Sequence, residues 1–163
     1  MKTPRLGGVV RKMAAVLAVS AAGLTFIANH EGTVNVVYLD PVAIPTVCTG
    51  HTRTVSRADV GRSYAPEVCE RLLREDTAHA VAGVVRSIAV PISQDQFDAL
   101  VSFTFNIGNA ALHSSSLRRK LNDGDCKGAS AEFDRWIYAK RVKLPGLVTR
   151  RKDERSLFEQ DCP

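Results

Sequence analysis

The sequence predicts an α+β fold that is mostly helical, with a small β-hairpin lobe followed by a larger helical lobe. Residues 32–55 are rich in Val, Thr, Tyr and Gly, with Pro41 and Pro45 as breaks, which is typical of a β-hairpin region. Beyond them, apolar residues recur at helical spacing almost to the end of the chain. With 163 residues, 45% of them hydrophobic, the chain has the length of one domain and enough apolar side chains for a core.

The helical lobe is predicted from caps and apolar spacing. Residues 56–59 have the form of a variant helix cap, and Pro66 suits the first turn of a longer helix. Residues 93–96 form a capping box, ahead of a helix that ends near Gly108. We expect a turn at residues 145–146 and a short closing helix. The remaining helices are predicted from the following apolar residues: Leu117 and Leu121; Phe133, Trp136 and Ile137; Leu157 and Phe158.

Residues 1–30 have the layout of an export signal. Residues 1–12 are basic, and an uncharged, mostly apolar stretch runs from residue 13 through His30. Three interpretations are open: a retained membrane anchor, a signal cleaved at a small-x-small site such as residues 18–20, or an ordinary buried helix. Eighteen residues of helix span about 27 Å, slightly less than a hydrocarbon core of about 30 Å. We favour a weakly held anchor over residues 1–30, followed by a separate domain over residues 31–163.

The net charge of +5 is concentrated at the N-terminus. Residues 1–30 hold four basic residues and no acid, which leaves a net charge of only +1 for residues 31–163. The basic residues are scattered and no aromatic stacking platform accompanies them, so nucleic acid is not expected as a partner.

Four cysteines all lie beyond the export-like segment, at Cys48, Cys69, Cys126 and Cys162. They lack the close pairs of a zinc site, and no metal is expected. An even number of cysteines in an exported chain favours two disulfides, for which three pairings are possible. Four reduced, buried cysteines in a cytosolic protein are the alternative.

Two acids and a threonine lie in or just before the predicted hairpin, at Glu31, Asp40 and Thr46. Cleavage of a glycosidic bond needs one carboxylic acid to protonate the leaving oxygen and a second group to deliver water or attack the sugar. Glu31 and Asp40 could supply these groups. Two acids nine residues apart also occur in ordinary exposed hairpins, so the pair alone does not assign a function.

Three stretches together resemble the phage-type lysozymes, or endolysins. Glu31, Asp40 and Thr46 match, without gaps, the family's spacing Glu-x8-Asp-x5-Thr. Residues 96–108, which end in Phe-Asn-Ile-Gly, resemble the family's helix near the substrate cleft. Residues 145–154, with Pro-Gly-Leu-Val, two arginines and a glutamate, resemble its C-terminal part. These matches cover most of residues 31–163.

The resemblance implies a lysozyme-like, two-lobed fold and hydrolysis of the β-1,4 bond between N-acetylmuramic acid and N-acetylglucosamine in peptidoglycan. It implies Glu31 as general acid, with Asp40 and the Thr46 hydroxyl positioning the attacking water. The reaction would then be inverting, with carboxyl groups about 6.5–9.5 Å apart. No metal or organic cofactor is implied, and a monomer is expected. The resemblance further implies substrate-binding roles for Phe105, Asn106 and Gly108 and the disulfides Cys48–Cys69 and Cys126–Cys162.

The N-terminus resembles that of signal-anchor-release endolysins, in which a weak, uncleaved helix tethers an inactive enzyme and later slips out. This implies attachment to the bacterial inner membrane through residues 13–30, facing the periplasm, and later release into the periplasm for host-cell lysis. Some relatives control disulfide exchange through a cysteine in this helix. Residues 1–30 contain no cysteine, so control by repositioning of the helix is preferred.

Three alternatives to this interpretation are a secreted lysozyme with a cleaved signal peptide, a non-catalytic wall-binding protein on the same fold, and a membrane-active protein with the basic segment as effector. For His51, a structural role within the hairpin lobe is preferred to a catalytic one. Trp136 could stack on a sugar, but its helical spacing favours a core position. His30, beside Glu31, is assigned no role.

Overall fold

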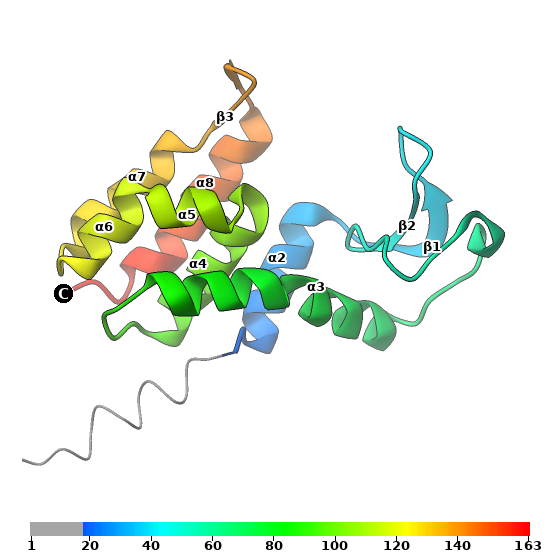
Figure 1. Ribbon diagram of the computed structural model, residues 1–163, viewed down its shortest axis with the longest axis horizontal. Helices are drawn as coiled ribbons and strands as arrows, with labels where there is room; N and C mark the ends of the chain where they lie inside the picture. The colour runs from blue at the N-terminus through cyan, green and yellow to red at the C-terminus, as the bar shows by residue number, and fades with distance from the viewer. Residues whose placement is uncertain (1–17) are drawn as a thin grey trace, which may run out of the picture. The chain divides into compact units, whose positions relative to one another are not determined.

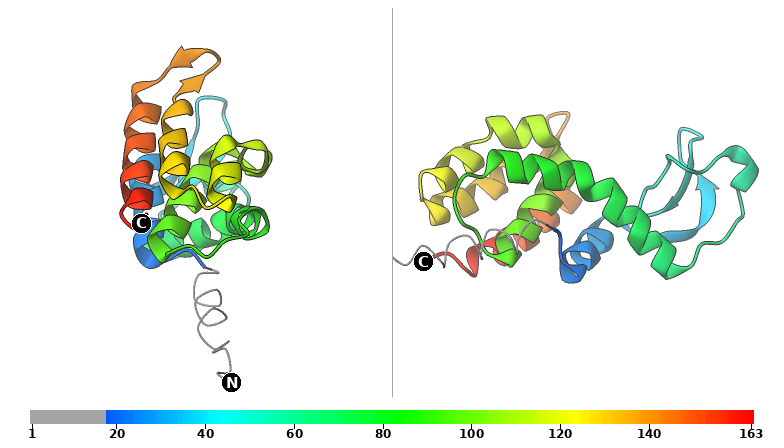
Figure 2. Two further views of the ribbon diagram at one scale, coloured as in Figure 1. Left: turned by 90° about the vertical axis from the view of Figure 1, so that its left-hand side faces the viewer. Right: turned by 60° about the horizontal axis from the view of Figure 1, so that its bottom comes forward.

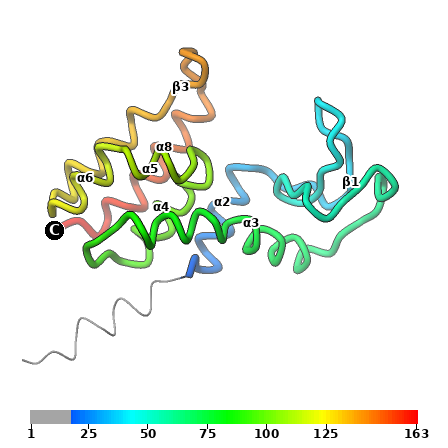
Figure 3. Tube along the Cα trace, in the orientation of Figure 1, coloured from blue at the N-terminus to red at the C-terminus, as the bar shows by residue number. Residues whose placement is uncertain are grey.

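The computed structural model describes residues 18–163 and divides them into two compact units. One unit comprises residues 21–78, and the other comprises residues 18–20 and 79–163 of the described chain. The order of the elements runs from blue to red in Figure 1 and can be followed along the trace in Figure 3. Helices predominate and the described sheets are two-stranded, so the predicted α+β class is confirmed.

The unit of residues 21–78 contains the predicted hairpin. Its elements are α2 (Ala21–Glu31), β1 (Val34–Leu39), β2 (Pro45–Cys48), the 3-10 turn η1 (Arg57–Asp59) and the first part of α3 (Pro66–Ser87). The strands are antiparallel, with Tyr38 opposite Thr46 and Leu39 opposite Pro45. Side chains from the hairpin and α3 form a buried cluster: Val37, Val47, Cys48, Cys69 and Leu72.

The second unit is almost entirely helical. Its elements after α3 are α4 (Gln94–Ile107), α5 (Asn109–Ser114), α6 (Ser116–Asn122), α7 (Cys126–Glu132), η2 (Phe133–Arg135), β3 (Tyr138–Ala139), β4 (Val142–Lys143) and α8 (Pro145–Glu159). Helix α8 packs against α4, α7 and η2 (Figure 2). The ring centroid of Phe103 in α4 lies 5.0 Å from that of Phe133 and 5.5 Å from that of Trp136. These edge-on aromatic contacts place α4 at the centre of this core.

Several helix boundaries follow the predicted caps. The Ser93 hydroxyl accepts a hydrogen bond from the Gln96 backbone N–H (3.1 Å), and the Gln96 side-chain oxygen accepts one from the Ser93 N–H (3.0 Å). This reciprocal capping box starts α4, as predicted. Gly108 ends α4 with φ +91°, a conformation that glycine adopts without steric cost. Pro66 is the first residue of α3, also as predicted.

Three local predictions are wrong. Pro145 and Gly146 do not form a turn: they begin α8, which is also longer than the short closing helix expected. Backbone N–H groups in the first turn of a helix have no partner within the helix, so a proline, which lacks an N–H, loses no hydrogen bond there. A Pro-Gly pair is therefore compatible with a turn and with the start of a helix. Trp136 and Ile137 are not helical, because the chain leaves α7 through η2 before reaching them. The turn in this region instead lies between β3 and β4.

Each unit contains one disulfide. Cys48 at the end of β2 is bonded to Cys69 in α3, and Cys126 at the start of α7 is bonded to Cys162. This is the pairing implied by the resemblance. The first bond ties the hairpin to α3, and the second ties the C-terminal end of the chain to α7.

Candidate active site

Glu31 is the last residue of α2, and its side chain is exposed. The helix stops there because Gly32 adopts φ +76°, in the left-handed region, and its N–H donates to the Ala28 carbonyl (2.9 Å). A glycine immediately after the glutamate therefore fixes where the helix ends. The carboxyl group is left at an exposed helix terminus, three residues before β1 begins.

Asp40 and Thr46 are joined by the peptide of Ile44 in the hairpin turn. The Ile44 carbonyl accepts hydrogen bonds from the Asp40 N–H and from the Thr46 hydroxyl, each at 3.0 Å. The Ile44 N–H (2.8 Å) and the Val42 N–H (2.9 Å) donate to the same Asp40 carboxylate oxygen, Oδ1. The turn thus brings both predicted residues together and holds the Asp40 carboxylate in one orientation.

In this turn, Asp40 and Thr46 each keep an oxygen that can accept a further hydrogen bond. Among the described residues, Asp40 Oδ2 accepts no hydrogen bond. Thr46 donates its only hydroxyl proton to Ile44, so its oxygen can only accept from a further partner. A carboxylate oxygen and a hydroxyl oxygen that both accept are suited to bind the two protons of one water molecule. Glu31 lies on a different element of the same unit.

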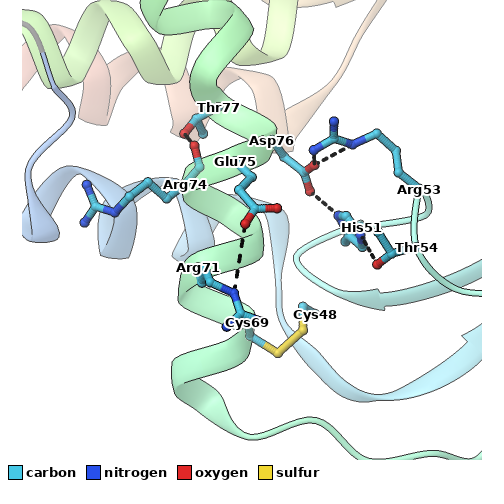
Figure 4. A network of polar contacts seen from close by, with 10 residues as sticks. All are labelled: Cys48, His51, Arg53, Thr54, Cys69, Arg71, Arg74, Glu75, Asp76 and Thr77. Atoms are coloured by element: carbon cyan, nitrogen blue, oxygen red, sulfur yellow. Dashed lines mark hydrogen bonds and ion pairs between the residues drawn. A yellow bond between two sulfur atoms is a disulfide. The ribbon is translucent and has the colours of Figure 1, made fainter.

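His51 has the structural role that the sequence favours. Its side chain is 2% exposed, and Figure 4 shows it between Asp76 of α3 and Thr54 of its own loop. Nδ1 lies 2.8 Å from Asp76 Oδ2, and Nε2 lies 2.8 Å from Thr54 Oγ1. Arg53 donates to the other Asp76 oxygen through Nε (3.1 Å) and Nη2 (2.6 Å). The backbone of His51 also pairs with Val47, the residue after Thr46.

The proposed substrate-binding residues lie at the end of α4. Phe105 is half-buried, and Asn106 and Gly108 are exposed. The side-chain oxygen of Asn106 accepts a hydrogen bond from Arg151 Nη2 (3.1 Å), so this residue is already held by α8. The substrate-binding roles of these three residues stay predictions.

Arg151, which bonds Asn106, belongs to a buried cluster of charged residues in α8. The Glu154 carboxylate is fully buried and receives hydrogen bonds from Arg150, Arg151 and the Ser102 hydroxyl (2.7 Å). Burial raises the pKa of Glu154, and the two arginines and the serine oppose that rise. The guanidinium of Arg151 also lies 5.0 Å from the Phe103 ring centroid.

The hydrogen-bond partners of His51 and of Glu154 were not predicted from the sequence. The stretch containing Arg150, Arg151 and Glu154 was matched to a family, but its i, i+3 and i+4 spacing could also have indicated a helical ion cluster. Nothing in the local sequence indicates that Asp76 pairs with His51. Among residues 18–163, no group of three His, Cys, Asp or Glu side chains could hold a metal ion.

A cavity of about 240 Å³ lies in the same unit as the hairpin, between α2, β1 and α3. Leu24 and Ala28 of α2 and Leu73 of α3 contribute to its lining, with Asn35 and Glu70 among the polar residues. Glu31, Asp40 and Thr46 are not among its lining residues, although Ala28 and Thr33, on either side of Glu31 in the chain, are.

Comparison with known proteins identifies similar sequences over nearly the whole chain. The family model for phage lysozyme matches residues 28–154. An endolysin of Acyrthosiphon pisum secondary endosymbiont phage 1 is 41% identical over 145 residues, which cover 86% of this chain and 97% of that protein. A SAR-endolysin of Enterobacteria phage P21 is 35% identical over 152 residues, which cover 93% of this chain and 89% of that protein.

The fold is also found in solved structures. A crystal structure of a P22 lysozyme mutant superimposes with a TM-score of 0.79 and 33% sequence identity. The match covers 86% of this chain and 97% of that structure.

Proposed function

The chain belongs to the phage lysozyme family and is a peptidoglycan-hydrolysing endolysin of the muramidase type, and we propose that Glu31, Asp40 and Thr46 carry out the hydrolysis. The bond cleaved is the β-1,4 linkage between N-acetylmuramic acid and N-acetylglucosamine. The observation that supports the assignment is the shared Ile44 carbonyl, which binds both Asp40 and Thr46 at 3.0 Å.

Glu31 is the general acid in this proposal. Its exposed position at the end of α2 lets a glycan strand reach the carboxyl group. The protonated carboxyl donates its proton to the glycosidic oxygen as the C1–O bond breaks, so that the leaving sugar departs as a neutral alcohol.

Asp40 and Thr46 orient the attacking water. The water donates one proton to Asp40 Oδ2 and the other to the Thr46 oxygen, which directs its lone pair at the anomeric carbon. Asp40 then takes the proton as the new C1–O bond forms. Attack from the face opposite the leaving group inverts the anomeric configuration, and the product carries an α-anomeric reducing end.

Glu31→Gln tests the assignment, because it keeps the side-chain shape and removes the proton donor. The expected loss is about 10²- to 10⁴-fold in turnover of purified peptidoglycan, with folding retained. Glu67→Gln is the matched control, because Glu67 is an exposed glutamate in the first turn of α3. Near wild-type turnover by Glu31→Gln would refute the assignment. NMR of fresh reducing ends checks inversion, and an initial β-anomer would contradict the role given to Asp40.

The tethering proposal is that residues 1–30 are a retained signal-anchor and residues 31–163 the catalytic domain. Residues 13–30 hold the inactive enzyme in the inner membrane, facing the periplasm, until it is released. Of this segment the structure describes residues 18–30, and the basic residues 1–12 lie outside the described part. In residues 18–163 no helix is long and apolar enough to cross a membrane. Support comes from α2, whose Leu24 and Ile27 are buried, as expected of a released segment that has packed on the protein.

Leucine substitutions test the anchor. Ser20→Leu with Gly23→Leu strengthens insertion by a few kcal/mol at most on insertion scales, so lysis should be delayed or abolished while the protein accumulates in the membrane fraction. Collapse of the membrane potential should hasten lysis by the wild type more than by this variant. N-terminal sequencing of the exported protein is the second check. A mature chain that begins after residue 20 would rule out a retained anchor and leave a secreted lysozyme.

A further inference from the structure

Asp98 is a buried acid in α4 that the catalytic proposal does not use. Its side chain is 2% exposed. The carboxylate accepts hydrogen bonds from the Ser20 N–H (3.0 Å) and from the Ser20 hydroxyl, one at each oxygen. These contacts join residues 78 positions apart in the chain and belong to the same compact unit.

Gln94, one turn earlier on α4, fixes the same stretch. Its side-chain amide donates to the Ala18 carbonyl (3.1 Å) and to Asp98 Oδ1 (2.9 Å). Val19, between the two bonded residues, is 4% exposed. Residues 18–20 are thus held to α4 by backbone and side-chain hydrogen bonds and by burial of an apolar side chain.

Asp98 depends on Ser20 for its donors. Among the described residues, all of its hydrogen bonds come from Ser20 and Gln94. Without Ser20, the Asp98 carboxylate would keep one protein donor, the Gln94 amide, and would exchange its other hydrogen bonds for bonds to water. The full set of protein donors to Asp98 is therefore present only when residues 18–20 lie on α4.

We propose that Asp98 and Gln94 form the binding site for the released N-terminal segment and that this site drives release from the membrane. The inference rests on the proposed function, in which residues 18–20 lie in the bilayer before release. The same residues cannot lie in the bilayer and on α4 at once. Because the site binds only the released form, it shifts the equilibrium toward release. A hydrogen bond to a charged acceptor contributes a factor of about ten or more to such an equilibrium.

Substitution of Asp98 tests the inference without changing the apolarity of the anchor. The full-length chain is expressed in host cells, and transfer from the membrane to the periplasmic fraction is followed after the membrane potential is collapsed. Asp98→Asn and Asp98→Ala should slow transfer by about tenfold or more. Asp95→Asn, on the same helix without a hydrogen bond to residues 18–20, should transfer at the wild-type rate. Ser93→Ala, which removes the α4 cap, is the control for a general loss of stability.

If the Asp98 variants do not accumulate as folded protein, a second pair of variants tests the same binding site. Ser20→Ala removes the hydroxyl donor but also makes the anchor more apolar. Thr25→Ala is its matched control, because it changes apolarity similarly and removes only a local bond to the Ala21 carbonyl. Slower transfer for Ser20→Ala than for Thr25→Ala supports the site. Equal rates for this pair overturn it.

Two further outcomes would overturn this inference and leave the tethering proposal intact. One is a wild-type transfer rate for a folded Asp98→Asn, and the other is equal slowing of transfer by Ser93→Ala and Asp98→Asn. The double variant Ser20→Ala/Asp98→Asn should transfer no more slowly than the slower of the two single variants. If the two reductions in transfer rate multiply instead, the two residues do not act through one shared contact. If the wild type never appears in the membrane fraction, the tethering proposal itself fails, whatever the Asp98 variants do.

Discussion

Glu132 links the stability of the helical unit to pH. Its carboxylate accepts a hydrogen bond from Lys120 Nζ (2.6 Å), and Arg135 lies nearby. The Lys120 hydrogen bond lowers the pKa of Glu132 below its ordinary value of 4.5, although burial opposes this. Because the pKa is lower in the folded state, the stabilisation is fully present above about pH 4.5. It is lost as the pH falls through the pKa of the folded state.

Lys120→Met should therefore destabilise the protein in a pH-dependent way. The expected loss is about 1 kcal/mol in the free energy of unfolding at pH 7, since Lys120 is partly exposed. The difference from the wild type should shrink as the pH is lowered toward 3. Urea unfolding at several pH values measures it, with the exposed Lys152→Met as control. A constant difference across this range would contradict the role of the Glu132 charge.

His51 is a buried residue whose removal should destabilise the hairpin unit. His51→Ala leaves Asp76 with Arg53 alone, removes the partner of Thr54 and opens a cavity. We expect a loss of about 3 kcal/mol in the free energy of unfolding. His79→Ala, at an exposed position of α3, should change stability by less than about 0.5 kcal/mol. If urea unfolding gives similar values for both variants, the His51 network does not stabilise the unit.

At the scale of elements, the turn between β3 and β4 is strained. Lys140 and Arg141 have φ values of +48° and +65°, in the region that hairpin turns usually give to Asn-Gly or Gly-Gly. Lys140→Asn with Arg141→Gly should therefore raise the free energy of unfolding by about 1 kcal/mol. Lys143→Asn, in β4 of the same hairpin, has no such strain to relieve and serves as control. Thermal unfolding compares the three proteins, and a double variant no more stable than the wild type would contradict the strain.

Elements were predicted correctly where the residues that define them lie close together in the sequence. The hairpin, the Ser93 cap and the Asp40–Thr46 spacing involve residues a few positions apart, and the sequence was sufficient for them. Pro145 was misassigned because Pro-Gly suits both a turn and a helix start, and only packing of α8 against α4 decides between them. The Ser20–Asp98 contact spans 78 positions and leaves no local pattern to recognise.

At the scale of the whole molecule, each compact unit has its own disulfide. Cys48–Cys69 closes a loop with a sequence separation of 21 within residues 21–78. Cys126–Cys162, with a separation of 36, lies entirely in the other unit. Neither bond crosses between the units, so each restricts the unfolded chain of one unit only.

Removal of the two disulfides should therefore destabilise the protein additively. Cys48→Ala/Cys69→Ala and Cys126→Ala/Cys162→Ala should each cost about 3 kcal/mol, because the unfolded chain regains the entropy of an open loop. The chain without any cysteine should lose the sum of the two values, to within about 0.5 kcal/mol, since the bonds share no partners. Guanidinium unfolding of the four proteins measures this. A cysteine-free chain that deviates strongly from the sum would mean that the disulfides are coupled through the rest of the molecule, and the two units would then not be energetically independent.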